Sequence, residues 1–191
     1  MRIHAGYEIS YDCFQPTPMI LMLSVHPSRT LDLVTVDRMQ VDPLLPINTY
    51  HDNFGNFCHV LRAPACRLTL SADFVVEDSG QPDAIAPQAL QHALEDLPVE
   101  VLIYLLGSRH CETDLLSGIA APMDFSAWFE AYLGGRWYTF DARHNMPRIG
   151  RVLMARGRDA TDVAISTSFG PCILAGFKVI TEEAALAFST S

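Results

Sequence analysis

The sequence predicts a mainly β protein, with an antiparallel β-sandwich first, then a smaller antiparallel sheet and a few short helices. Two observations lead to this prediction. In residues 1–80, short apolar runs with a period of two are broken by Pro, Gly, Asn and Asp, a pattern typical of antiparallel all-β units. Further along the chain, two aromatic-rich runs flank Gly134-Gly135, as in a hairpin closed by a tight turn.

The N-terminal sandwich is expected to span residues 1–105 and to contain about five to seven strands. Its first run, RIHAGYEISYDC, places alternate apolar residues on one face: Ile3, Ala5, Tyr7 and Ile9. The other expected strand runs are PMILMLSVHP, the less regular TLDLVTVDRMQV, NFCHVLRA and CRLTLSADFVVED. SGQPDAIAP at 79–87 is the best candidate linker. A short helix is expected at 87–98, followed by a buried run, VEVLIYLLG.

The second unit is expected to span residues 106–191. It begins with a short helix in SRHCETDLLSGIA, capped by Ser108. The predicted strands and turns that follow are a hairpin at 123–141, a strand and turn at 149–165, and a last strand at 172–181. We find no internal repeat and no low-complexity tract.

Charge and cysteine usage exclude several classes of protein. The chain has a formal net charge of −9 and a pI near 5.1, so it repels phosphate backbones and no nucleic-acid partner is expected. Its densest basic stretch, 143–158, is interpreted as solvated strand and loop ends. The five Cys include no CxxC pair, so neither a disulfide framework nor a zinc site is predicted. We expect no metal and no cofactor.

The location of the protein is also predicted from composition. The N-terminus has no apolar stretch typical of a signal peptide, and the longest apolar run, VEVLIYLLG, is too short to span a bilayer. Widely spaced Cys at apolar positions are typical of reduced core residues. We therefore expect a cytoplasmic protein without a membrane partner.

The run SAWFEAYLGGRWYTFD, residues 126–141, resembles a pattern of the bacterial transglutaminase-like superfamily: His-Ala-Trp-x-Glu-x-Tyr, a Gly turn, then Trp-x-x-Phe-Asp. Downstream, GRDATDV at 157–163 resembles that family's GRDxxDV. The family members that this chain resembles also carry an N-terminal β domain. The resemblance therefore covers most of the chain and implies a sandwich followed by the β half of a transglutaminase-like core.

The resemblance implies papain-like chemistry, in which a Cys thiolate attacks an amide carbonyl, a His transfers the proton and an Asp orients the His. Asp141 matches the orienting carboxylate, and the hairpin is expected to set it across from position 126. Ser126 stands at the His position and cannot act as a base near neutral pH. No Gly-x-Cys-Arg-Asp motif occurs, and the Cys-bearing helices would be inserted near Ala120-Ala121. Cys111 is the nearest substitute nucleophile and His144 a substitute base.

Three hypotheses follow. The chain is a transglutaminase-like protein with a protein or peptide substrate, catalytically deficient in this form. Alternatively, it is a non-catalytic β-domain for protein binding or self-assembly, and a homo-oligomer forms through an uncovered sheet face. That face would carry Trp128, Phe129, Trp137 and Phe140. A metal hydrolase is the third hypothesis, and no paired-His spacing supports its candidate ligands: His110, Cys111, Asp114 and His144.

Overall fold

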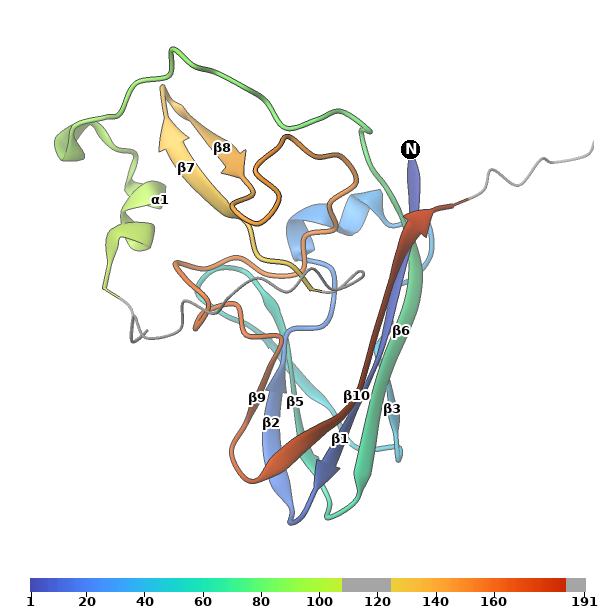
Figure 1. The fold of residues 1–191 in the computed structure, drawn as a ribbon. Coiled ribbons are helices and arrows are strands. Elements are labelled where there is room, and N and C mark those ends of the chain that lie inside the picture. Colours follow the sequence, from blue (N-terminus) through green and yellow to red (C-terminus); the bar gives the residue numbers. More distant parts are fainter. Residues whose placement is uncertain (108–124, 185–191) are drawn as a thin grey trace, which may run out of the picture.

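Two four-stranded antiparallel sheets form the core of the protein, with strand orders β10-β1-β6-β3 and β4-β5-β2-β9. A separate two-stranded sheet, β7-β8, lies beyond one end of them (Figure 1). The computed structural model describes residues 1–107 and 125–184. The strands are β1 (Arg2–Cys13), β2 (Thr17–Leu21), β3 (Gln40–Asp42), β4 (Asn48–His51), β5 (Phe57–Ala63), β6 (Arg67–Glu77), β7 (Phe129–Leu133), β8 (Arg136–Phe140), β9 (Ser166–Ser168) and β10 (Cys172–Glu183).

Helical structure is sparse in the described residues. It consists of one α-helical turn, α1 (Val99–Leu102), and three 3₁₀ segments at Pro27–Asp32, Leu94–Asp96 and Ile103–Leu105. No helix in the described part of the chain is long and apolar enough to cross a membrane. The predicted mainly β class is therefore confirmed.

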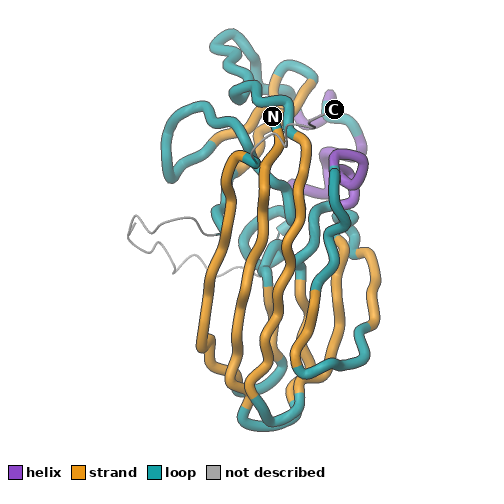
Figure 2. The backbone as a smooth tube through the Cα atoms, turned by 90° about the vertical axis from the view of Figure 1, so that its right-hand side faces the viewer, coloured by secondary structure: helices purple, strands orange, loops and turns teal. Residues whose placement is uncertain are grey.

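The period-two pattern of the first run determines how β1 packs. Ile3, Ala5, Tyr7 and Ile9 are all buried, as their alternation predicts. They form one core with the inward residues of β2, β5 and β6, so the two sheets pack face to face. Burial of each large apolar side chain contributes about 1.5–3 kcal/mol. Figure 2 shows the long strands of this sandwich side by side.

Strands from the end of the chain complete both sheets. β10 pairs with β1 along nearly its whole length, from Ile3↔Glu183 to Cys13↔Cys172. β9 pairs with β2 at the edge of the second sheet. The last strand, expected at 172–181 in the second unit, thus belongs to the same sheet as the first strand of the chain. The division into units at residue 105 stays a prediction.

The predicted hairpin is present. β7 and β8 pair antiparallel, with Phe129 opposite Phe140 and Leu133 opposite Arg136. Gly134 and Gly135 both have positive φ, 54° and 86°, which a two-residue hairpin turn of this kind requires. The hairpin ends at Phe140, so the polar residues that follow begin where the ladder stops.

Four local predictions are wrong. TLDLVTVDRMQV does not form a strand over its length: its first residues end a 3₁₀ segment, Pro27–Asp32, and only Gln40–Asp42 is strand. VEVLIYLLG is not a buried run: it forms α1 and the following 3₁₀ turn, and Val101 is its buried residue. In 87–98, only Leu94–Asp96 is helical. The segment has no buried residue, and a helix this short needs packing against the rest of the protein to be stable. No strand forms within 149–165. The helix expected from Ser108 lies outside the described residues.

The segment 149–165 has no partner among the described strands, and the side chain of Asn56 binds part of its backbone instead. Asn56 is fully buried; its Nδ2 donates to the backbone oxygen of Arg156 (2.7 Å), and its Oδ1 accepts from the backbone N–H of Arg156 (2.7 Å). The backbone N–H of His26 donates to the oxygen of Leu153 (2.8 Å). These bonds fix an extended segment against the sandwich without a ladder, which strand periodicity cannot predict.

Candidate functional site

The polar residues after β8 form a closed turn around the carboxylate of Asp141. Its Oδ1 accepts hydrogen bonds from the backbone N–H groups of Arg143 (3.1 Å) and His144 (3.0 Å). The backbone oxygen of Asp141 accepts from Asn145 (2.7 Å), which has a positive φ of 51°. Asp and Asn favour such turns because their short side chains bond to nearby backbone groups. The Asp141 side chain is only 5% exposed.

The imidazole of His144 also binds Asp141. Its Nδ1 lies 3.0 Å from Oδ2 and 3.1 Å from Oδ1 of the carboxylate. Because a carboxylate can only accept, Nδ1 carries the proton in this pair. Nε2 has no hydrogen-bond partner among the described residues, and the side chain is 36% exposed. The carboxylate thus fixes the tautomer of this imidazole and leaves its Nε2 accessible.

Arg151 joins Asp141 to the predicted linker at 79–87. Its guanidinium pairs with Asp141 at 3.4 Å and with the carboxylate of Asp83. It also lies over the Trp128 ring, 5.3 Å from the centroid. The other oxygen of Asp83 accepts from the backbone N–H of Arg148 (2.8 Å). One arginine therefore ties together the linker, the residue before β7 and the turn after β8.

Asp141 is ionised over the whole neutral range. Burial alone raises the pKa of a carboxyl, but the hydrogen bonds from His144 and Arg151 outweigh burial and hold the pKa of Asp141 below its usual range. The carboxylate can therefore fix the orientation of donors around it, and it cannot act as a general acid at neutral pH.

Ser126 is not paired with Asp141 across the hairpin as we expected. The ladder begins at Phe129↔Phe140, and continuing its register would place Trp128, rather than Ser126, opposite Asp141. The Ser126 hydroxyl is buried and has no hydrogen-bond partner in the described structure. Ser126 lies eight residues before Gly134, whereas Asp141 lies six residues after Gly135, so a hairpin with this two-residue turn cannot place them opposite each other.

The described cysteines lie in the sandwich. They are Cys13, Cys58, Cys66 and Cys172, all with free thiols. No hydrogen bond joins any of these four thiols to Asp141 or His144. Cys111 lies outside the described residues, as do His110 and Asp114. In the described ranges, no group of three or more metal-ligating side chains comes together.

The GRDATDV segment is held by its own charges. Arg158 donates to Asp162 through Nε (2.7 Å) and Nη2 (3.0 Å), and through Nη1 to the backbone oxygen of Gly107 (3.0 Å). At Gly157, an added Cβ would lie 2.3 Å from Cβ of Asp162, so glycine is required by close approach. Arg158 thus anchors Gly107, which follows the helical region at 99–105.

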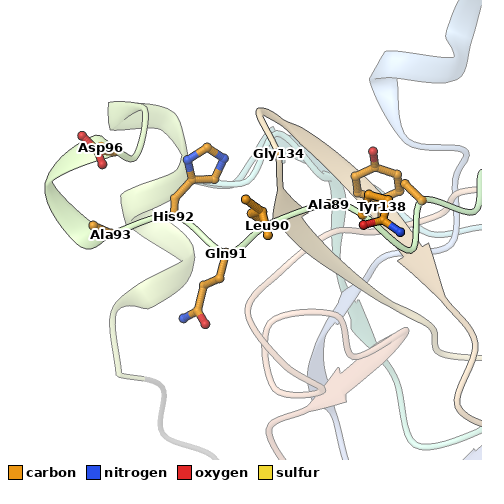
Figure 3. A pocket seen from close by; sticks show the side chains of 10 residues that line it. Ala89, Leu90, Gln91, His92, Ala93, Asp96, Gly134 and Tyr138 are labelled. Carbon is orange, nitrogen blue, oxygen red and sulfur yellow. The ribbon is translucent and has the colours of Figure 1, made fainter.

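A shallow hollow of about 530 Å³ lies beside the hairpin turn at Gly134 (Figure 3). It is lined by residues of 86–96, with Gly134 and Tyr138, and does not include Asp141. Nε2 of His92 accepts from the backbone N–H of Gly135 (2.8 Å). The His92 ring also contacts the ring of Tyr132, with centroids 5.5 Å apart. Both contacts are with the hairpin, so we infer that His92 supports the hairpin. Sequence reasoning missed it.

Comparison with known proteins gives a match at the level of the fold. No family model matches the chain, and no curated protein matches it. A solved structure described as a "putative cysteine protease", from Cytophaga hutchinsonii, superposes with a TM-score of 0.71 at 18% identity. The match covers 99% of this chain and 92% of that one. The chain thus shares its fold with that protein.

Proposed function

We propose that this chain is a transglutaminase-like protein, related to papain-like cysteine peptidases, that lacks amide-bond chemistry and binds a protein or peptide segment. The fold shared with the C. hutchinsonii protein supports the relation. So do the runs at 126–141 and 157–163, which resemble the family in order and spacing. The identity of 18% supports the fold alone, so the chemistry must be argued from the residues.

The observation that carries the proposal is the state of positions 126 and 141. Asp141 matches the orienting carboxylate, but its partners are His144 and Arg151. Ser126, at the position of the family's His, has a buried hydroxyl without a partner. A serine hydroxyl does not accept a thiol proton near neutral pH, so nothing at position 126 can generate the thiolate on which this chemistry depends.

An aromatic pair on the hairpin supports the binding role. The rings of Phe129 and Phe140 stack across the two strands, with centroids 5.2 Å apart, and the residues are 53% and 41% exposed. On the opposite face, Trp137 contacts Tyr104 at 5.3 Å and Tyr132 at 5.4 Å. Phe129, Trp137 and Phe140 thus do not share one face as expected. Trp137 is itself 38% exposed, and the Phe129–Phe140 face is the more exposed of the two. Paired aromatic rings are frequent anchors of protein contacts.

Activity assays on three forms of the full chain test the missing chemistry. The wild type, Asp141→Asn and Cys111→Ser are assayed for peptide-amide hydrolysis and for amine incorporation into a glutamine-containing protein. We expect all three to match buffer alone. The proposal fails if the wild type is active and both substitutions lower kcat/KM by about a hundredfold or more.

The Asp141–His144 pair favours a second candidate function. If Cys111 reaches Nε2 of His144, the pair would form a complete cysteine-type site despite Ser126. The rate of Cys111 alkylation by iodoacetamide, followed by peptide mass against pH, separates the two candidates. Under our proposal, its midpoint lies near the ordinary thiol pKa of about 8.5 and is unchanged in His144→Gln. Under the second, it lies below about 7.5 and returns to the ordinary value in that variant.

The binding role is tested with peptides selected on the wild type from a random display library. We expect Phe129→Ser to weaken their binding at least about tenfold, or roughly 1.4 kcal/mol. Phe14→Ser is the matched control, because Phe14 is 62% exposed and lies outside the hairpin. Equal weakening by both variants, or by neither, contradicts the assignment. Sedimentation of the same variants tests self-assembly as the alternative use of this surface.

A further inference from the structure

Two thiols face each other where the first and last strands of the described chain meet. Cys13 is the last residue of β1 and Cys172 the first of β10, and they are direct partners in the antiparallel register. The two Sγ atoms are 2.9 Å apart, and both thiols are free. Figure 1 shows β1 and β10 running side by side to this end of the sandwich. The two residues are separated by 159 positions, so no sequence spacing predicts their contact.

The backbone places this pair correctly for a covalent bridge. The N–H of Cys13 donates to the oxygen of Cys66 (2.9 Å), next to β6, whereas the N–H of Phe14 donates toward Pro171 (3.5 Å), next to β10. Cys13 therefore turns its backbone polar groups away from β10, and the pair occupies a non-hydrogen-bonded position. Such pairs have Cα atoms about 4.5 Å apart, within the range of roughly 4.4–6.8 Å that disulfides need.

We propose that Cys13 and Cys172 form an oxidation site, in which a cross-strand disulfide is made by exchange with a low-molecular-weight disulfide such as oxidised glutathione. The Cys172 thiolate attacks one sulfur of the reagent and releases one glutathione thiolate. The Cys13 thiol then loses its proton to solvent, and its sulfur attacks the Cys172 sulfur and releases the second glutathione thiolate. Two protein thiols are oxidised and one glutathione disulfide is reduced, so the electrons balance.

The order of the two steps follows from accessibility. Cys13 is 4% exposed, whereas Cys172 is half-buried, so the external reagent reaches Cys172 first. Burial, together with the neighbouring Cys172 thiol, raises the pKa of Cys13 to about 12. Cys13 is thus a poor attacker of an external disulfide, but it is already in contact with the sulfur that it must attack in the second step.

The bridge would fix an edge strand. β10 lies at the edge of its sheet and pairs with β1 alone, and the bridge would close a loop that contains most of the chain. Closing a long loop restricts the unfolded state, so we expect oxidation to raise Tm by roughly 5–15 °C. Oxidation would link β10 covalently to β1. This link does not depend on the proposed function of the hairpin.

The test uses the full chain, reduced, freed of reductant and incubated while folded with excess oxidised glutathione. Remaining thiols are alkylated and the bridge is located by peptide mapping. We expect a linked Cys13–Cys172 peptide, an intact mass lower by two hydrogen atoms, and a Tm increase that dithiothreitol reverses. Cys172→Ala should give neither bridge nor Tm increase. Cys66→Ala is the matched control, because Cys66 is also half-buried, and it should retain both.

Three results would overturn the proposal. Both cysteines could be recovered fully alkylated after the incubation. The bridge could join Cys13 to Cys66, whose backbone adjoins Cys13. The bridge could also form only after urea unfolding. The mapping on the wild-type chain distinguishes these results without any variant, so a variant that fails to fold does not weaken the test.

Discussion

Replacement of Arg151 by Ala removes the cation that lies between two carboxylates. Its guanidinium pairs with Asp83 and with Asp141, and it covers the ring of Trp128. Without it, the two acids face each other without a cation between them, and the ring loses its cover. The substitution creates an uncompensated charge pair where the linker, the hairpin and the turn after β8 meet.

The size of the effect follows from burial. The side chains of Arg151 and Asp83 are each 16% exposed, and that of Asp141 is 5% exposed. Removal of one partner from a buried ion pair costs about 3–5 kcal/mol. Asp141 keeps its bonds from His144, and water can reach Asp83, so we expect the lower end, about 3 kcal/mol. For a chain of this length, that lowers Tm by roughly 6–12 °C.

Urea unfolding followed by circular dichroism measures this loss. The midpoint should fall in Arg151→Ala with an unchanged m-value, and Arg151→Lys should lie between it and the wild type. Arg67→Ala is the control: it removes a pair with Asp12 whose side chains are 65% and 38% exposed, and solvent screening should make the contribution of this pair to stability small. If Arg151→Ala costs no more than Arg67→Ala, the reasoning from burial is wrong.

The pH dependence provides an independent measurement of the same group. The pKa of Asp141 in the folded protein lies below its ordinary value of 3.8. A depressed folded pKa stabilises the protein above the unfolded pKa, and that contribution is lost as the pH falls through the folded value. Stability of the wild type should therefore decrease below about pH 4, and the decrease should be shallower in Arg151→Ala.

Three further changes test other parts of the fold. The hydrogen bond from His4 to Glu182, and after it the one to Asp73, raises the pKa of His4. The contribution of His4 to stability should be full below pH 6.5 and lost as the pH rises through the pKa of the folded protein. The urea midpoints of wild type and His4→Gln should therefore converge above that pKa. Asn56→Ala should cost about 2–4 kcal/mol in urea unfolding, because buried backbone groups lose their partner. Gly157→Ala should lower Tm, by overpacking worth about 1–3 kcal/mol, and a Tm equal to that of the wild type contradicts the close approach.

Local periodicity predicted the strands that have one buried face, and β1 is the clearest example. The partners of the late strands could not be predicted in this way. The apolar composition of CILAGFKVIT predicts that β10 is extended, but not that it pairs with β1, because pairing depends on packing between distant residues. The segment 149–165 has strand-like composition, yet its backbone groups bond to the side chain of Asn56 and to other loops.

The role of the candidate site stays a prediction. Asp141 was singled out because the run that ends at it resembles the transglutaminase-like pattern, and it lies at the centre of a hydrogen-bond network. Arg151 and Asp83 were missed, because the basic stretch 143–158 was interpreted as solvated and 79–87 as a linker. The available signal was the opposite charge of the two segments. An acid in a turn-rich linker and a basic stretch beside a hairpin are candidates for an ion pair, although composition alone cannot pair them.

The hydrogen-bond network around Asp141 determines how strongly this residue supports a catalytic role. A carboxylate has about four acceptor sites. Those of Asp141 are used by two backbone N–H groups, the ring of His144 and the guanidinium of Arg151. These bonds close the strand end and hold the linker, so Asp141 has a structural role that is independent of catalysis. The presence of Asp141 is therefore weak support for an enzyme, and the decision rests on whether a thiol and a base meet beside it.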